Sequence, residues 1–227
     1  MISYFGGKNG SGTLQFLINH FPPHKVYLEP FLGSGAIIRN KKPAEVNIGI
    51  EVNQEVIDEY HYSAGYTVIN DCAISYLKKK LLHGTYDKDY FIYADPPYLH
   101  STRKSKTRYK FELTELQHRQ LIKILMSISA EGAKIAISHY ENPIYNSLLK
   151  KWNKWKYKNQ TRSGSVTEVL YTNYSIPETL HDYNFLGKNF TDRQRIKRKI
   201  ARHVDRLKEL PAQERNAILH ALGDLKT

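Results

Sequence analysis

The sequence of 227 residues has very little cysteine and no apolar run long enough to cross a bilayer. Its single cysteine, Cys72, excludes an internal disulfide and any zinc site built from several cysteines. The first residues, Met1 to Tyr4, lack the charged and apolar regions of a signal peptide. These absences predict a cytoplasmic protein of a reducing compartment that does not enter a membrane, and we expect no metal ion.

Acidic side chains are absent from two basic stretches and outnumbered in a third, and the net charge is +12. Residues 99–110 carry five Lys or Arg and residues 147–162 carry six, with no acid in either stretch. Residues 187–227 carry eleven Lys or Arg against five acids. One such stretch would fit an ordinary solvated surface. Three of them favour an enzyme that binds nucleic acid, because neutralising phosphates releases condensed counterions.

Short apolar runs alternate with helical patterns as far as residue 174, which predicts an α/β fold. The expected strands are Val26–Glu29, Val46–Glu51, Thr67–Asn70, Phe91–Ala94, Lys134–Ser138 and Val166–Asn173. A helix is expected between the fourth and fifth strands, because Thr114 and Gln117 form a capping box before a stripe of Leu121, Leu125 and Ile128. Residues 76–82 also suggest a helix.

The composition changes after Tyr174, so we divide the chain into a catalytic domain, 1–175, and a basic helical extension, 176–227. Residues 176–188 have the composition of an irregular connector. Thr191 and Gln194 suggest a capping box that opens a helix with one apolar face, formed by Ile196, Ile200, Val204 and Leu207. Pro211 is expected to end this helix and begin a second one, which Gly223 would end.

The most informative motif is Asp95-Pro96-Pro97-Tyr98, directly after an apolar strand. Ligands of open α/β sheets bind at the carboxyl ends of strands. The N6 amine of adenine is a poor nucleophile, and the Asp95 carboxylate and Pro96 carbonyl can accept its N–H groups and make it more nucleophilic. The two prolines hold these acceptors rigid, and Tyr98 offers a ring for stacking an extruded base. An ordinary turn after a strand would explain the prolines but neither Asp95 nor Tyr98.

Two further motifs suggest a cofactor site. Glu29 to Gly35 follows the first strand, and its glycines allow a tight turn and close approach of the backbone to a ligand. Glu51 ends the next strand, where an acid can hold ribose hydroxyls, and Asp71 follows the third, where it can hold an adenine ring. Each acid alone would also fit an ordinary surface residue. Tyr4-Phe5-Gly6-Gly7-Lys8 adds glycines and a lysine that can pair with a ligand carboxylate.

Together these motifs, in this order, resemble the Dam-type family of DNA adenine methyltransferases. Gly132 to Ser138 and Thr167 to Tyr174 are also similar to that family, so the resemblance covers residues 2–175. It implies a Rossmann-like fold with a mixed seven-stranded sheet and a reversed last strand, and S-adenosylmethionine as cofactor. It implies methyl transfer to N6 of a flipped adenine in DNA, in a prokaryotic cell or a phage-infected host, in some cases beside a restriction nuclease.

Site residues follow by position. The expected catalytic residues are Asp95, Pro96, Pro97 and Tyr98. The expected cofactor-binding residues are Tyr4, Phe5, Lys8, Glu29, Phe31, Gly33, Ser34, Gly35, Glu51, Asp71 and Asp95. The basic character of their segments adds Arg103, Lys104, Lys106, Arg108, Lys197 and Arg198 as expected DNA-binding residues.

The chain departs from the family in three places. Only 24 positions separate Asp71 from Asp95, where the family usually carries a target-recognition insert, so we expect a short or relaxed target sequence. Glu51 stands where aspartate is common, and Ser138-His139 replaces a Ser-Asn pair. His139 is either a residue of the site or an ordinary histidine at a strand end.

Other functions stay open at this stage. Methylation of adenine in RNA would use the same motif on bases that are already unpaired. A catalytically silent DNA-binding subunit would use only the basic segments. Glutamine methylation is a further alternative, although its motif usually begins with Asn. The single cysteine argues against a thiolate mechanism on cytosine.

Overall fold

The computed structural model describes residues 8, 12–59, 65–84, 86–103, 110–161 and 164–225. Seven strands form one sheet in the order β3-β2-β1-β4-β5-β7-β6. Their bounds are β1 (Val26–Glu29), β2 (Val46–Glu51), β3 (Thr67–Asn70), β4 (Tyr90–Ala94), β5 (Lys134–His139), β6 (Asn153–Thr161) and β7 (Gly164–Thr172). The first five strands are parallel, whereas β7 runs antiparallel to both β5 and β6. The predicted mixed seven-stranded Rossmann-like sheet with a reversed last strand is confirmed.

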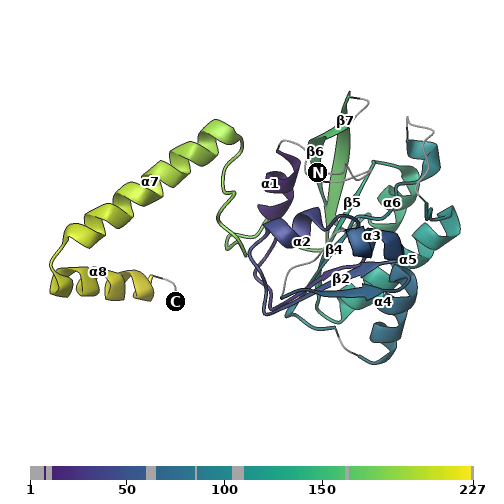
Figure 1. Cartoon of the computed structure of the whole chain (residues 1–227), viewed down its shortest axis with the longest axis horizontal. Coiled ribbons are helices and arrows are strands. Elements are labelled where there is room, and N and C mark those ends of the chain that lie inside the picture. Colours follow the sequence, from purple (N-terminus) through teal and green to yellow (C-terminus); the bar gives the residue numbers. More distant parts are fainter. Residues whose placement is uncertain are drawn as a thin grey trace. The chain divides into compact units, whose positions relative to one another are not determined.

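Helices flank this sheet (Figure 1). In the first unit they are α1 (Thr13–Ile18), α2 (Ala36–Asn40), α3 (Gln54–Glu59), α4 (Ala73–Leu82), α5 (Glu115–Ala130) and α6 (Pro143–Leu148). Helix α1 contacts α2 and strand β6, whereas α5 contacts both α4 and α6. In Figure 1, α1 and α2 lie on the left of the sheet, and α4, α5 and α6 on its right. The sheet is thus covered on both faces, which explains why its central strands are almost continuously apolar.

Helix α5 begins and packs as its local sequence predicts. Thr114 is its N-cap and accepts a hydrogen bond from the Gln117 amide, and the Gln117 side chain accepts one from the Thr114 amide. The predicted stripe of Leu121, Leu125 and Ile128 is completely buried in the main hydrophobic core. The capping box therefore sets where this helix begins, and the stripe sets the face that it buries.

Strand β6 was not predicted from the sequence. Its residues alternate between the two faces of the sheet, with Lys154, Lys156 and Lys158 exposed and Tyr157 and Asn159 buried. This segment was expected only to be a basic stretch. Its period of two was the available signal for a strand with one solvated face.

The chain divides into two compact units, residues 1–184 and 185–227. The first unit therefore extends beyond residue 175, where the composition changes. Within the connector, the His181 amide donates to the Phe21 carbonyl at 3.1 Å and the Lys42 amide donates to Asp182 at 2.8 Å. The connector has no helix or strand, as predicted, but its first half belongs to the first unit.

The second unit contains two helices, α7 (Phe190–Glu209) and α8 (Ala212–Asp224). The predicted capping box of Thr191 and Gln194 is wrong, because the N-cap is Asn189, whose side chain accepts from the Asp192 amide at 2.9 Å. Pro211 separates the helices as predicted, and α8 continues through Gly223 for one residue. In the described part of the chain, no helix is long and apolar enough to span a membrane.

Candidate active site

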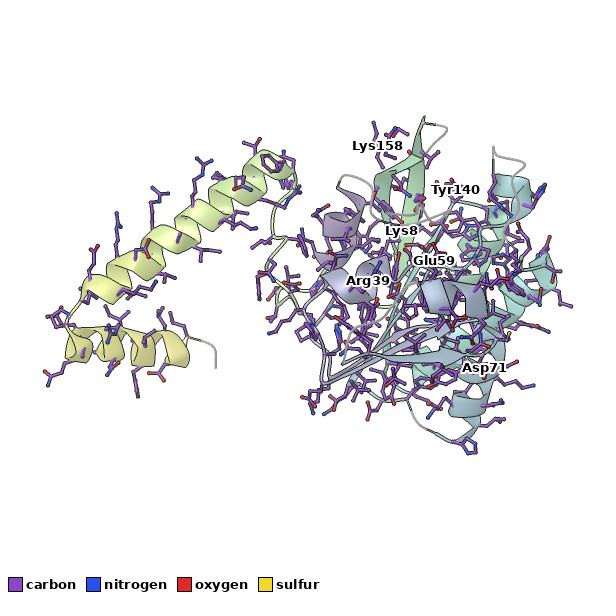
Figure 2. The ribbon with its side chains drawn as sticks, in the orientation of Figure 1. Lys8, Arg39, Glu59, Asp71, Tyr140 and Lys158 are labelled. Carbon is purple, nitrogen blue, oxygen red and sulfur yellow. The ribbon has the colours of Figure 1, made fainter. Side chains whose placement is uncertain are left out.

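The sequence motifs meet at one edge of the sheet, where the parallel strands β1, β2 and β4 end. Strand β1 lies between β2 and β4. The chain adds β2 and β3 on one side of β1 and then crosses over to add β4 and β5 on the other side. In open α/β sheets this reversal is the place where ligands bind. The glycine loop follows β1, Glu51 ends β2, and Asp95 follows β4. Figure 2 shows Lys8 near the middle of the first unit, with Asp71 well away from it.

The glycine loop between β1 and α2 has the backbone conformation that the sequence suggested. Gly33 and Gly35 have φ angles of 50° and 65°, in the left-handed region that favours glycine. The Leu32 amide donates to the Ile50 carbonyl at 2.9 Å, which fixes the loop to β2. Leu32 also packs on Gly49 so closely that an added Cβ would lie 2.6 Å from its Cδ2. Gly49 thus gives the loop room to lie flat on the sheet.

Glu51 connects β2 to the glycine loop. Its Oε2 accepts from the Gly33 amide at 2.8 Å, and its Oε1 accepts from the Asn53 amide at 2.9 Å. Burial raises the pKa of the Glu51 carboxyl, and these backbone hydrogen bonds oppose that rise. Each carboxylate oxygen keeps a second lone pair. Glu51 is therefore placed to accept from the ribose hydroxyls of a cofactor while it holds the loop.

The remaining cofactor candidates differ in their surroundings. Glu29 is buried and accepts from the Tyr27 hydroxyl at 2.9 Å and from the Ile38 amide of α2 at 3.1 Å. Burial raises the pKa of the Glu29 carboxyl to about 8. Its two hydrogen-bond donors both belong to the protein, which fits a structural residue. Phe31 packs partly buried against the core. Ser34 is buried, and Asp71 is half-buried and accepts from the Cys72 amide at 2.7 Å.

Asp95 and Lys8 lie together in the interior. The Lys8 ammonium is 3.1 Å from Asp95 Oδ1 and forms an ion pair with this oxygen. Burial raises the pKa of Asp95 to about 6, with Lys8 opposing the rise and the Glu168 charge adding to it. Because a carboxylate has about four lone-pair sites, Asp95 could accept from an N–H donor of a ligand in addition to pairing with Lys8.

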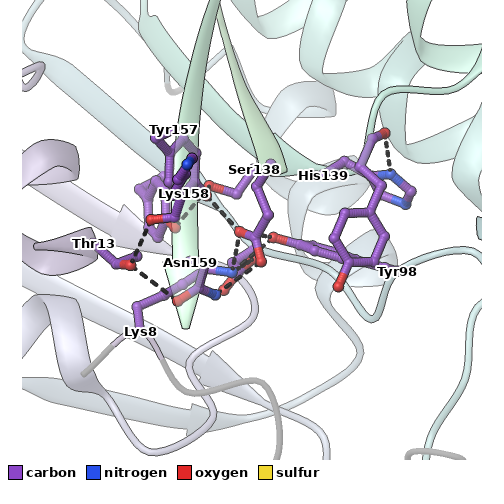
Figure 3. Close-up of polar contacts among 12 residues, drawn as sticks. Lys8, Thr13, Tyr98, Ser138, His139, Tyr157, Lys158 and Asn159 are labelled. Carbon is purple, nitrogen blue, oxygen red and sulfur yellow. Dashed lines mark hydrogen bonds and ion pairs between the residues drawn. The ribbon is translucent and has the colours of Figure 1, made fainter. Parts of the chain in front are cut away.

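Lys8 also belongs to a buried polar network that the sequence did not reveal (Figure 3). Its ammonium donates to the Tyr98 hydroxyl at 2.7 Å and to Glu168 Oε2 at 3.0 Å. Tyr98 and Tyr157 each donate to Glu168 Oε2, at 2.8 Å and 2.7 Å. Burial alone would raise the pKa of Glu168, but Lys8 and the hydrogen-bond donors hold it below its usual range. The signal available in the sequence for this role was an acid that directly precedes the apolar residues Val169 to Tyr171 of β7.

The Tyr98 ring is almost enclosed and leaves only 6% of the residue exposed. The His139 ring lies 4.7 Å from it and the Tyr140 ring 4.8 Å, measured between centroids. A base that stacks on Tyr98 must therefore displace a neighbour, and Tyr140 is only half-buried.

His139 supports the loop that follows the motif. Its Nε2 accepts from the Leu99 amide at 3.0 Å, and its Nδ1 lies 2.9 Å from the Tyr140 carbonyl. With Nε2 accepting, the proton is assigned to Nδ1. Burial lowers the pKa of His139 to about 3, so the ring stays neutral. Of the two readings that the sequence left open, this geometry fits a structural residue next to the site.

The predicted DNA-binding residues are only partly described. The Arg103 side chain is buried and forms an ion pair with Glu112 inside the protein, so in this structure it does not face a DNA phosphate. Lys197 and Arg198 are exposed on α7, in the second unit. Tyr4, Phe5, Lys104, Lys106 and Arg108 lie outside the described residues. In the part of the chain that is described, no three His, Cys, Asp or Glu residues gather as metal ligands would.

Distant solved structures are similar to this chain over part of its length. A SAM-dependent methyltransferase from Agrobacterium tumefaciens is 13% identical with a TM-score of 0.44, and the match covers 70% of this chain and 58% of that one. An rRNA methylase from Streptococcus thermophilus is 12% identical with a TM-score of 0.43, covering 70% of this chain and 92% of that one. Similarities this low do not inform the substrate. No curated protein matches the sequence.

The sequence itself matches one protein family. Residues 67–164 match the model of the D12 class N6 adenine-specific DNA methyltransferases. This stretch runs from β3 to the start of β7 and includes Asp95 to Tyr98. Enzymes that methylate N6 of adenine take the methyl group from S-adenosylmethionine. The sheet-edge motif thus lies within a stretch that is similar to the D12 class N6 adenine-specific DNA methyltransferases and that spans somewhat less than half of the chain.

Proposed function

We propose that this chain transfers a methyl group from S-adenosylmethionine to N6 of an adenine extruded from DNA. The observation that carries the proposal is the position of Asp95-Pro96-Pro97-Tyr98 at the sheet edge, beside the glycine loop and Glu51. The Asp95 carboxylate, which is largely buried and shares Lys8 with a second acid, adds to it. We place the reaction in the cytoplasm of a prokaryotic cell or a phage-infected host.

The residues present suit the cofactor. Glu51 would accept from the ribose hydroxyls, and the backbone of Gly33 and Gly35 would pass close to the bound molecule. Asp71, at the end of β3, would accept from the adenine amine of the cofactor. When bound, the cofactor supplies a methyl group on a positively charged sulfur. The negative charge of the site, two carboxylates around one lysine, favours this cation.

The motif would activate the target amine. Asp95 and the Pro96 carbonyl would each accept a hydrogen bond from one of the two N6–H groups, which would localise the lone pair on the nitrogen. With the cofactor bound, that lone pair would form the new N–CH₃ bond as the S–CH₃ bond breaks, and N6 would then release one proton. With a pKa of about 6, Asp95 is mostly ionised at neutral pH and can accept this proton.

The row of lysines on β6 is suited to the DNA backbone. Lys154, Lys156 and Lys158 point to the same side of an edge strand, at intervals of roughly 7 Å for alternate residues. Lys154 bonds to Asn146 and Lys156 pairs with Glu141, but exposed contacts of this kind are weak. Phosphates can therefore replace these partners.

The span between Asp71 and Asp95 leaves no room for a reading element. Helix α4 and strand β4 occupy most of it. Each good contact to a base edge contributes about 1–3 kcal/mol, and few candidate side chains are available. We therefore propose a short target, with one to three specified bases around the adenine.

Expression in a host without its own adenine methylation tests this function. We expect N6-methyladenine in the DNA, mapped at single-base resolution to a short motif. Asp95→Ala should lower transfer on the order of a hundredfold or more, because one electrostatic contact to the reacting group is lost. Methylation confined to RNA would select the RNA enzyme, no methylation of either would favour the silent subunit, and a strict motif of four or more bases would refute the short target.

A further inference from the structure

Besides the four residues Asp95 to Tyr98, a buried acid on β7 contacts the candidate active site. We propose that Glu168 is a positioning residue, whose carboxylate holds the Lys8 ammonium and the Tyr98 hydroxyl and keeps Lys8 from pairing with Asp95 alone. The proposal rests on the function proposed above, because it concerns the same reaction.

The hydrogen bonds of Glu168 come from four different side chains. Its Oε1 accepts from Asn159 Nδ2 at 2.8 Å, and its Oε2 accepts from Lys8, Tyr98 and Tyr157 at 2.7–3.0 Å. Only 2% of Glu168 is exposed. A buried carboxylate needs such donors, because an unpaired one would be very costly. Glu168 therefore has one well-defined position.

The origin of these donors shows that Glu168 does more than stabilise its own hairpin. Asn159 and Tyr157 lie on the neighbouring strand β6. Lys8 and Tyr98 are 160 and 70 positions away in the sequence, and Tyr98 belongs to the catalytic motif. Figure 3 shows Lys8, Tyr98, Tyr157 and Asn159 converging on one point. Glu168 thus connects the β6–β7 hairpin to the motif.

Lys8 lies between two carboxylates, 3.1 Å from Asp95 and 3.0 Å from Glu168. One positive charge therefore serves two acids. If Glu168 were neutral, Lys8 would pair with Asp95 alone and compete with the target amine for the same oxygen. With Glu168 charged, part of the acceptor capacity of Asp95 stays available for that amine.

The other charged groups around Asp95 do not change this reasoning. Glu29 on β1 adds a repulsion, but burial raises its pKa to about 8 and thus favours its neutral form. The other ionisable neighbours among the described residues are tyrosines, which burial keeps neutral near pH 7: Tyr27, Tyr93, Tyr98, Tyr140, Tyr145 and Tyr157. Among the described residues, Lys8 and Glu168 are thus the two charged groups that act on the pKa of Asp95, in addition to the burial of its carboxyl.

Two substitutions should move the titration of Asp95 in opposite directions. Glu168→Gln keeps the size and one acceptor oxygen but removes a negative charge, so Asp95 should titrate at lower pH. Lys8→Met removes the positive charge, so Asp95 and Glu168 should both titrate at higher pH. Charges at this distance shift a carboxyl pKa by about one pH unit or more.

Carbon-13 NMR of the side-chain carboxyl groups, on the full chain without ligand, measures both midpoints. The matched control is Glu141→Gln, which removes an exposed acid paired with Lys156. Equal directions for Glu168→Gln and Lys8→Met, or midpoints that move no further than in the control, would overturn the proposal. If Glu168→Gln does not fold, Lys8→Met decides alone, because a shared lysine must shift both acids.

The pH profile of methyl transfer gives the second readout. The acid limb of kcat/KM should move to lower pH in Glu168→Gln, while kcat falls because Lys8 competes for Asp95. An enzyme that is active but shows no such change refutes the positioning role. A chain that methylates nothing contradicts the proposed function instead, and the NMR midpoints still test the sharing of Lys8.

Discussion

The hydroxyl of Tyr98 has more partners than base stacking requires. From the sequence alone, Tyr98→Phe should be milder than Tyr98→Ala, because stacking uses only the ring. In the structure, this hydroxyl accepts from Lys8 and donates to Glu168, both buried. Removing one partner of a buried polar contact leaves the other unsatisfied. We therefore expect Tyr98→Phe to have a measurable cost, although the ring remains.

Tyr98→Phe should lower the free energy of unfolding by about 1–3 kcal/mol, the usual penalty for an unsatisfied buried group. Urea unfolding of the full chain measures it. Tyr140→Phe is the matched control, because Tyr140 contacts the same ring and its hydroxyl has no hydrogen-bond partner among the described residues. Equal stability of the two variants would show that the Tyr98 hydroxyl contributes nothing.

The positions of single residues in the fold were predictable where a short motif directly follows a strand. Asp95, Glu51 and the glycines of the loop lie at strand ends and turns, and short sequence patterns identify such places. Glu168 was missed because its partners Lys8 and Tyr98 are distant in the sequence. Only the register of β7 against β6, and the place of β7 beside β5, bring these groups together.

At the scale of single elements, β6 combines a structural edge with a row of positive charge. Neutralising Lys154, Lys156 and Lys158 together as glutamines should weaken DNA binding. The slope of log K against log salt should fall by about one for each lost phosphate contact. Fluorescence anisotropy with labelled duplex DNA, at several salt concentrations, measures both quantities.

Three lysines of α4, Lys78, Lys79 and Lys80, provide a control with the same change of charge. Figure 2 shows Asp71, just before α4, at the opposite end of the first unit from Lys158. The α4 variant should leave the salt slope close to that of the unmodified chain. If both variants weaken DNA binding equally, the effect comes from net charge alone, and the lysines of β6 do not form a specific contact with the DNA backbone.

The elements themselves were predicted unevenly. The bounds of β1, β2 and β3 agree with the sequence analysis, because each is a short apolar run between turn residues. The start of α7 was wrong, since Asn189 accepts from the N3 amide before Thr191 can act as a cap. Competing caps only two residues apart cannot be separated by composition.

The whole chain is composed of two units, and their boundary can be tested by truncation. Leu180 and Asp182 are buried in the first unit, and the His181 ring stacks on His24 with centroids 3.7 Å apart. A chain that ends at Ile176 should therefore be less stable than one that ends at Asn184. The lost hydrogen bonds and the exposure of Leu180 should cost at least about 2 kcal/mol.

Calorimetry of the two truncated chains tests this boundary. A loss of 2 kcal/mol corresponds to roughly 4–8 °C in Tm for a chain of this size. Both chains lack α7 and α8, so the second unit does not affect the difference. Equal Tm values would place the boundary near residue 176, where the composition changes.

The position of β7 in the sheet also has a consequence for synthesis. Strand β7 follows β6 in the sequence but lies between β5 and β6. While the ribosome is still making residues before 164, β6 has no neighbour to pair with, and Lys8 has no Glu168. The nascent chain can thus build the parallel half of the sheet early, but its active centre forms only after β7 emerges. Incomplete chains that lack β7 should therefore be inactive. The slow step of folding should be this late pairing of strands that are distant in the sequence.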